Sequence, residues 1–416
     1  MLKNDCFALP PGVDWTPVPE ALALLRGRMA PVTAMETVGL AAARGRVLAE
    51  AVRAPHATPP HDNAAVDGYA LAHASLTPEG EQRLTLLEGR AAAGAPFAGE
   101  VGAGQAVRVL TGAAMPRGAD SVVMQEDVEV EGGAIRFGSG LKPGANRRCA
   151  GEDMAAGALA LEAGRWLDAA DLAQAASVGL DALPVRAPLR VAVLSSGDEL
   201  REPGEPVPYG RIHDANRPML AALAAAPGFA VIDRGRLPDR AEAVRDGLAE
   251  AAATADAVLV SGGASAGDED HVARELASLG SMALWRVAVK PGRPLALGMV
   301  GGVPVFGLPG NPVAAFVCFL VFARPALRVM AGGAWEEPAR YPVRVQGGTR
   351  KRPGRTEYLR ARYLGGGEVE VFPSQGSGLI GGLRWSDGLL ELDHDRDRLA
   401  DGEMANFLPY AGLGLR

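Results

Sequence analysis

Three segments of this chain combine glycines with charged or hydroxyl side chains directly after a run of apolar residues. They are SSGDEL (195–200), SGGASAGDED (261–270) and GLPGNP (307–312). Glycine lets the backbone approach a phosphate closely, and the N–H groups at a following helix start attract anions. The carboxylates in these loops would repel a phosphate unless a hard cation such as Mg²⁺ lies between them. The segments therefore indicate binding of a phosphorylated ligand together with magnesium.

Several residues of these segments are candidates for direct contact with such a ligand. The loop residues that we select are Ser196, Gly197, Ser261, Gly262, Gly263, Ser265, Pro309, Gly310 and Asn311. The candidate metal ligands are Asp270, Asp268 and Glu199, and Asp239 joins the acidic set because it follows the apolar run that ends in RGRLP. Each segment taken alone has a second interpretation, since glycine turns and acidic residues also begin helices without binding any ligand.

A basic segment, RVAVKPGRP (286–294), supplies the complementary charge. Its cations are Arg286, Lys290 and Arg293, and Pro291 helps to restrict the backbone that presents them. A rigid basic loop suits an oxyanion such as phosphate or molybdate, because guanidinium and ammonium groups form charge-assisted hydrogen bonds with it. The alternative interpretation is a solvated basic turn.

The glycine-bearing segments follow strands of one predicted α/β part, residues 189–331. Apolar runs such as LRVAVLS, FAVIDRGRL and DAVLVSGG alternate with helical stretches such as DANRPMLAALAAA, and the apolar helix NPVAAFVCFLVFARPALRVMA closes the series. Near-continuous apolar strands that alternate with helices indicate a doubly wound, mostly parallel sheet. Ligands of such sheets bind beyond the carboxyl ends of the strands, where the three segments would meet.

The rest of the chain indicates three further parts. Helical spacing occurs in ALALLRGRM and VGLAAARGRVLAEAV within residues 17–52, and helix returns in residues 152–188. Short alternating runs between Gly and Pro turns predict a small β domain between these helical stretches, and similar runs predict a terminal β domain. The predicted divisions are 14–56 with 154–188 (helical, discontinuous), 57–153 (inserted β), 189–331 (α/β) and 335–416 (terminal β).

Composition argues against several classes of function. The formal net charge is −7 and aromatic residues make up 5%, unlike the basic, stacking surface of a general nucleic-acid binder. Three widely spaced cysteines favour a reducing compartment. The N-terminus lacks a secretory pattern, and the longest apolar stretch, Pro312 to Ala323, is too short to span a bilayer. We expect a soluble cytoplasmic protein that contacts neither nucleic acid nor membrane.

Seven motifs, taken in order along almost the whole chain, carry a resemblance to a known family. They are PPHDNAAVDGYA, LTGAAMPRGADSVVMQED, RRCAGED, SSGDEL, SGGASAGDEDH, VKPGRP and GLPGNPV. This set resembles the molybdopterin molybdenumtransferase family, which includes MoeA and the gephyrin E domain. The resemblance implies an L-shaped homodimer whose subunits have a discontinuous helical domain, an inserted β domain, an α/β molybdopterin-binding domain and a C-terminal β barrel.

The resemblance also implies a reaction and roles for single residues. Adenylylated molybdopterin and molybdate would be the substrates, Mg²⁺ would be required, and AMP would leave as the dithiolene sulfurs bind molybdenum. The implied catalytic residues are Asp270, Lys290, Glu199 and Asp239. Arg286, Lys290 and Arg293 would bind substrate anions or molybdate. The residues implied to face the partner subunit's α/β domain are Asp67, Thr111 and Asp153, and those implied at the molybdate pocket are Arg355, Arg360 and Ser377.

Other partners and other functions follow from the same resemblance. The upstream adenylyltransferase and the downstream apo-molybdoenzymes are further candidate partners. One alternative is a scaffold or paralogue of the family that binds a molybdopterin-like ligand without inserting metal. Another is adenylyl transfer by the α/β domain itself, which would be revealed by supplying ATP and molybdopterin in place of the adenylylated substrate.

Overall fold

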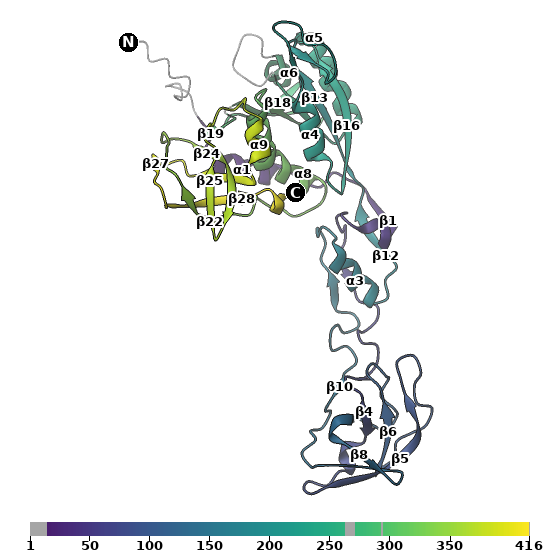
Figure 1. Ribbon diagram of the computed structural model, residues 1–416. Coiled ribbons are helices and arrows are strands. Elements are labelled where there is room, and N and C mark those ends of the chain that lie inside the picture. Colours follow the sequence, from purple (N-terminus) through teal and green to yellow (C-terminus); the bar gives the residue numbers. More distant parts are fainter. Residues whose placement is uncertain (1–14, 263–270, 293, 416) are drawn as a thin grey trace.

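The computed structural model describes residues 15–262, 271–292 and 294–415 of the 416-residue chain. Figure 1 shows an elongated, bent molecule. A β-rich part lies at one end, a narrow part that contains α3 lies in the middle, and the α/β and C-terminal β parts lie together at the other end. The predicted multidomain α/β plus β fold class is confirmed.

The α/β part is built on a six-stranded sheet. Its strands are β13 (Leu189–Ser196), β16 (Phe229–Leu237), β17 (Ala257–Ser261), β18 (Gly280–Arg286), β20 (Pro294–Val300) and β21 (Val303–Leu308), and a small pair is formed by β14 (Leu200–Arg201) and β15 (Ile212–His213). Its helices are α4 (Asn216–Ala224), α5 (Ala241–Thr254), α6 (His271–Leu279), α7 (Pro312–Cys318) and α8 (Arg324–Met330), and a π-helical turn (Phe319–Ala323) joins α7 to α8. The strand order is β16-β13-β17-β21-β20-β18, in which the first four strands are parallel. Only β20 runs in the opposite direction, because β18 pairs antiparallel with β20 and so runs the same way as the first four. The predicted doubly wound, mostly parallel sheet is confirmed.

Both faces of this sheet are covered by helices, which explains why its strands are almost continuously apolar. Val191 and Val193 of β13 pack in one cluster with α4, α7 and α8. Ala192 and Leu194, which point to the opposite face because strand side chains alternate, pack in a second cluster with α5 and α6. The carboxyl ends of the strands are left between the two helical layers.

The helix that closes the α/β part corrects one expectation. Pro312–Met330 forms a continuous helical stretch of 19 residues, long and apolar enough to cross a membrane by length and composition, so the expectation of too short a stretch was wrong. The helix is this apolar because it packs on the sheet inside the molecule, where 83% of its most apolar 18-residue stretch is buried.

The C-terminal β part is a closed barrel. Its strands are β19 (Val289–Lys290), β22 (Tyr341–Gln346), β24 (Thr356–Gly365), β25 (Glu368–Val371), β26 (Gly388–Leu392) and β28 (Met404–Pro409). The order β19-β24-β25-β22-β28-β26 closes because β26 also pairs with β24. A separate pair is formed by β23 (Thr349–Arg350) and β27 (Arg398–Leu399), and one short helix, α9 (Gly381–Trp385), and a 3-10 turn (Ala411–Leu413) complete this part. Because β19 directly follows β18 in the chain, the β19–β24 pair ties the barrel to the α/β sheet.

The helical expectation for residues 17–52 is right for α1 (Val18–Arg28) and wrong for the second half. VGLAAARGRVLAEAV contributes instead to β1 (Met35–Gly39), the single turn α2 (Leu40–Ala43) and β2 (Val52–Arg53). Gly45 leaves the helical region with a φ of +72°, and antiparallel pairing of β1 with β12 (Ala182–Arg186) outweighs local helix propensity. Residues 152–188 are likewise helical only in α3 (Ala169–Ser177), with β11 (Leu159–Leu161) before it.

The helix α1 does not pack with α3. Its buried residues, including Leu22 and Leu25, share one apolar cluster with the α/β helices α7 and α8 and with Tyr358 and Leu408 of the barrel. This single core therefore joins α1, the α/β part and the barrel.

The β-rich part at the far end holds a six-stranded sheet in the order β7-β4-β6-β5-β9-β8. These strands are β4 (Gly68–Leu71), β5 (Gln82–Ala91), β6 (Gln105–Val109), β7 (Ser121–Met124), β8 (Glu129–Glu131) and β9 (Ala134–Phe137), and β3 (Asn63–Ala64) pairs with β10 (Arg147–Arg148) beside them. Two 3-10 turns, His73–Ser75 and Gln125–Asp127, connect the strands. Its own apolar clusters make it a separate core.

Candidate active site

The three glycine-bearing segments meet at the carboxyl edge of the α/β sheet. Ser196 at the end of β13 is the register partner of Leu237, and Ser261 at the end of β17 is the partner of Leu308. The Gly262 N–H donates to the Leu308 carbonyl at 3.1 Å. The loops that follow β13, β16, β17 and β21 therefore lie side by side, as expected for a parallel sheet.

Asp239 joins two of these loops. Its carboxylate accepts hydrogen bonds from the Ser196 Oγ at 2.9 Å and from the Asp198 backbone N–H at 3.0 Å. Asp198 in turn accepts from the Asp239 N–H at 3.3 Å. Glu199 is exposed and folds over Gly197, where a Cβ would lie only 2.5 Å from the Glu199 Oε2. Asp239 thus fixes the loop, while Glu199 presents a carboxylate at its surface.

The loop after β17 is pressed against the loop after β13. Gly262 has a φ of +94°, and a Cβ there would lie 2.2 Å from the Ser196 carbonyl oxygen. Asn216, at the start of α4, donates from its amide nitrogen to the Ser261 Oγ and to the Gly310 carbonyl, both at 2.7 Å. Sequence reasoning missed Asn216, because an asparagine at a helix start is indistinguishable from an ordinary cap.

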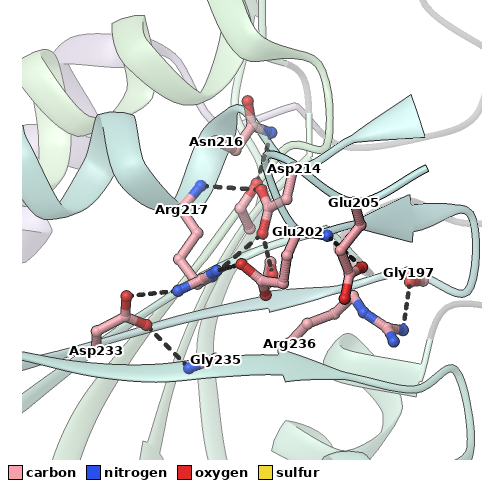
Figure 2. A network of polar contacts seen from close by, with 11 residues as sticks. Gly197, Glu202, Glu205, Asp214, Asn216, Arg217, Asp233, Gly235 and Arg236 are labelled. Carbon is pink, nitrogen blue, oxygen red and sulfur yellow. Dashed lines mark hydrogen bonds and ion pairs between the residues drawn. The ribbon is translucent and has the colours of Figure 1, made fainter. Parts of the chain in front are cut away.

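A polar network centred on two buried residues, Asp214 and Arg217, holds the arm that follows β13, which carries the parallel pair β14–β15. Figure 2 shows Arg217 of α4 among Asp214, Asp233 and Glu202, with which it forms ion pairs. Burial opposes the charged form of Arg217, but the three carboxylates together raise its pKa. Asp214, which is 1% exposed, also accepts from the Ser195 Oγ. This network, which the sequence did not reveal, anchors the β14–β15 arm at the sheet edge.

A basic seam lies where the barrel joins the α/β part. Lys290 of β19 and Glu357 of β24 are register partners, and the Lys290 Nζ lies 3.1 Å from the Glu357 Oε2. The Arg355 Nε lies 3.2 Å from the other carboxylate oxygen, and both Arg355 and Glu357 are almost fully buried. A cavity of about 710 Å³ opens here, and the residues that line it are Lys290, Arg350, Lys351, Arg352, Arg355, Glu357, Asp397 and Arg398. Sequence reasoning selected Lys290 and Arg355 but missed the other cations, although three of them, Arg350, Lys351 and Arg352, lie within five residues before Arg355.

Arg360 and Ser377 lie apart from this cavity. The buried guanidinium of Arg360 donates to the carbonyls of Ser374 and Leu379, both at 2.6 Å. The Ser377 carbonyl accepts from the Val313 N–H at 3.0 Å, at the first turn of α7. Arg360 therefore shapes the loop that carries Ser377, and that loop lies beside the GLPGNP segment.

Four further predicted residues flank these places. Arg286 is the last residue of β18, and Pro291 directly follows β19. Pro309 and the exposed Asn311 lie between β21 and α7, next to Gly310. The basic and glycine-rich loops also touch: a Cβ on Gly292 would lie 3.8 Å from the Pro309 Cγ.

Part of the predicted site lies outside the described residues. The predictions concerned are Gly263, Ser265, Asp268, Asp270 and Arg293. Within the residues that the structure describes, no three His, Cys, Asp or Glu side chains form a group that could hold a metal ion.

The predicted residues of the far β part do not reach the sheet edge of the same chain. Asp67 accepts hydrogen bonds from the backbone N–H and the Oγ1 of Thr111, both at 2.7 Å, and these bonds hold the pKa of Asp67 below its ordinary value. Asp153 is exposed, and its N–H donates to the Thr58 carbonyl at 3.0 Å. Figure 1 places β4, β6 and β10 at the end of the molecule opposite β13.

Comparisons with known proteins agree along the chain. The MoeA N-terminal region (domains I and II) matches residues 16–179, a probable molybdopterin binding domain matches 192–329, and the MoeA C-terminal region (domain IV) matches 342–410. The molybdopterin molybdenumtransferase of Haemophilus influenzae is 36% identical, over 92% of this chain and 95% of the relative. The molybdopterin molybdenumtransferase 2 of Mycobacterium tuberculosis is 35% identical, over 88% and 93%.

A solved structure supports the same conclusion. The molybdopterin biosynthesis MoeA protein of Pyrococcus horikoshii has a TM-score of 0.84 and 31% identity, and the match covers 95% of this chain and 100% of that protein. Sequence motifs, domain matches and whole-chain similarity coincide, and the chain belongs to the molybdopterin molybdenumtransferase family of enzymes.

Proposed function

We propose that this enzyme transfers molybdenum from molybdate to adenylylated molybdopterin, with Mg²⁺-dependent release of AMP. Family membership supports the coarser statement that it acts in molybdenum cofactor biosynthesis. The observation that carries the finer proposal is that phosphate-suited loops and a basic seam are neighbours. Gly292 links them, because it lies against both Pro309 of the glycine-rich loop and Cys318 of α7.

The loops at the sheet edge suit the phosphates of the adenylylated substrate. Gly262 and Gly310 carry no side chain that would cover the backbone, and Ser196 and Ser261 are held in place by Asp239 and Asn216. Backbone N–H groups and a helix start nearby favour negative charge. These loops would position the phosphoanhydride and exclude other orientations of the substrate.

Magnesium fits the carboxylates of this edge. Mg²⁺ is commonly held by one or two carboxylates together with substrate phosphates, so a group of three acidic side chains is not required. Asp198 and Glu199 are the exposed carboxylates of the described edge, and Asp268 and Asp270 are proposed to join them. When bound, the cation would neutralise charge on the phosphoanhydride and assist its cleavage.

The basic seam suits molybdate. Lys290 and Arg355 are held by Glu357, so that their cationic groups are positioned before a ligand arrives. A preorganised pair of this kind stabilises an oxyanion without the cost of ordering flexible side chains. Ser377 would contribute from the neighbouring loop at α7.

We infer that the enzyme works as a homodimer. The anionic carboxylate of Asp67 and the exposed Asp153 are candidates for contact with the partner subunit's sheet edge, because they lie far from the edge of their own chain. Light scattering combined with cross-linking between these residues and the α/β part tests this inference.

The proposed reaction is tested by mixing the purified enzyme with adenylylated molybdopterin, Mg²⁺ and molybdate. AMP release and activation of an apo-molybdoenzyme are followed together, with and without each component. We expect Asp270→Asn to abolish both, and the control Asp246→Asn, an exposed carboxylate on α5, to change neither. Binding of substrate without AMP release under every oxyanion tried would indicate a paralogue or scaffold instead.

A further inference from the structure

A tryptophan of the narrow middle part reaches into the core of the neighbouring domains. Residues 35–186 form a stalk, which comprises the middle part and the β-rich far end in Figure 1. The stalk has its own apolar core, to which Leu48 and Leu183 belong. Trp166 and Val47 of the stalk pair in an isolated bridge and pack instead against the core that α1, the α/β part and the barrel share. We call these three parts the body, and Trp166 therefore joins the stalk to the body.

The indole ring of Trp166 lies in a closely fitted seat on the body. It stacks on Phe229 at the start of β16, with ring centroids 5.5 Å apart and an angle of 22° between the ring planes. The guanidinium carbon of Arg328, on α8, lies 4.5 Å from the centroid of the Trp166 ring. Two glycines border the ring: a Cβ on Gly228 would lie 2.5 Å from the Trp166 Cζ3, and a Cβ on Gly333 would lie 2.3 Å from the Trp166 Nε1. The seat therefore requires that both of these positions carry no side chain.

The seat also contains polar groups that have no partner. Among the described residues, neither the Trp166 Nε1 nor the Arg328 Nε has a hydrogen-bond partner, and both atoms are buried. Burial lowers the pKa of Arg328, although its ion pair with the exposed Glu336 acts in the opposite direction. Apolar contact and the cation–π interaction hold the ring in the seat. Water would satisfy the unpaired groups if the ring left, so these groups favour its release.

Backbone hydrogen bonds tie the stalk to the body at the two chain crossings, one before β1 and one after β12. The Val32 N–H donates to the Met330 carbonyl at 3.0 Å, and the Ala187 N–H donates to the Ala34 carbonyl at 2.8 Å. Two attachment points leave rotation about the line that joins them, and a third point removes it. Trp166, on a different segment of the stalk, supplies a third point.

We propose that Trp166 is a positioning residue, whose ring fixes the direction of the stalk while it occupies the seat. When the ring leaves the seat, the stalk pivots about the two chain crossings. The far β part, which carries Asp67 and Asp153, then moves relative to the body. This motion belongs to the free enzyme, so it does not depend on the proposed reaction.

Single-molecule Förster energy transfer between two dyes reports the direction of the stalk in the full-length enzyme. One dye is attached to Cys149, which is exposed beside β10 in the far β part, and the other to the barrel through Met404→Cys, at an exposed position of β28. Cys6→Ser removes a further cysteine, and Cys318 is buried. An excess of unlabelled enzyme ensures that a dimer contains at most one labelled subunit. We expect the wild-type enzyme to give one narrow distribution of transfer efficiencies.

Gly333→Ala and Trp166→Ala empty the seat in two different ways. The Cβ added at Gly333 displaces the indole ring, and φ at Gly333 is outside the left-handed region that would strain alanine, whereas Trp166→Ala removes the ring itself. We expect each variant to raise the population of other stalk directions at least about tenfold, because the contacts of the ring are lost. Gly27→Ala on α1 serves as the control and should match the wild type, since no atom lies within 4 Å of its added Cβ.

The double variant Trp166→Ala with Gly333→Ala separates loss of this contact from general damage to the fold. Because the added Cβ then meets no ring, the double variant should differ little from Trp166→Ala alone. Additive effects in the double variant, or one narrow and unchanged distribution in both single variants, would overturn the proposal. Circular dichroism and thermal unfolding check that each variant is folded. AMP release in the assay above is a separate measurement, so failure here leaves the proposed reaction standing.

Discussion

Replacing Gly262 by alanine tests whether the phosphate-suited loops are packed as described. Two costs add at this position. The φ of +94° is unfavourable for alanine by about 1–3 kcal/mol. The added Cβ would also lie 2.2 Å from the Ser196 carbonyl oxygen, and because backbone must move to relieve that contact, overpacking costs about 1–3 kcal/mol more.

Gly302→Ala is the matched control. Gly302 lies in the turn between β20 and β21, has a φ of +84°, and has no atom within 4 Å of the position that a Cβ would occupy. It therefore carries the conformational cost without the clash. The difference between the two variants, about 1–3 kcal/mol, measures the contact between Gly262 and Ser196 alone.

Urea denaturation of both variants gives the free energies of unfolding, and their KM values for the adenylylated substrate give the functional effect. We expect Gly262→Ala to lose more stability and to show a raised KM, because the loop after β17 is displaced from the loop after β13. Gly302→Ala should keep the wild-type KM. Equal losses of stability in the two variants would refute the close packing of these loops.

Two further predictions concern charged side chains. Glu357→Gln removes the carboxylate between Lys290 and Arg355. Urea denaturation should show that the free energy of unfolding falls by about 3 kcal/mol and that added molybdate partly restores it. An unchanged free energy of unfolding would show that the basic seam does not depend on Glu357. The pKa of Asp67 is lower in the folded protein than its ordinary value of 3.8, so its hydrogen bonds to Thr111 stabilise the fold fully at pH values above 3.8. That stabilisation is lost as the pH falls through the pKa of Asp67 in the folded protein. Acid titration of Thr111→Val should therefore show the Asp67 pKa rising only partway toward 3.8, since the backbone N–H still donates, and a fully ordinary pKa would contradict this.

The sequence predicts the parts of the molecule whose structure follows from local pattern. A parallel sheet and its ligand-binding edge can be predicted from the apolar runs of β13 and β17 and from the glycines that follow them. Strands that are buried on both faces must be almost entirely apolar, and loops at strand ends that bind ligands are rich in glycine. The long helix after Asn311 is recognisable for the same reason. The second helix expected in VGLAAARGRVLAEAV (38–52) is wrong, because β1 pairs with a strand almost 150 residues later in the chain, and the local sequence does not indicate that partner.

The residues of the candidate site likewise fall into those that a local motif identifies and those that only the fold brings together. Ser196 and Gly262 stand in motifs, so their types and spacing make them visible. Asn216 and Arg217 make their contacts with residues that the fold brings from elsewhere in the chain, and each looks like an ordinary polar or surface residue in its own segment. Arg360 is different, because the sequence identifies it as a candidate but its guanidinium donates hydrogen bonds to backbone carbonyls of its own domain.

The two substrate-suited regions are mechanically connected through α7. Gly292, beside the basic seam, packs against Cys318 at one end of this helix, and the Val313 N–H at the other end donates to the Ser377 carbonyl. The same helix packs on β21, which carries the GLPGNP loop at its end and pairs with β17. Because α7 is buried along its whole length in a core shared with the barrel, the oxyanion side and the phosphate side cannot shift independently without breaking that core. A rigid connection of this kind favours the proposed transfer between two separately bound anions. The entropy lost in positioning the two binding regions is then lost once, during folding, and not at each turnover.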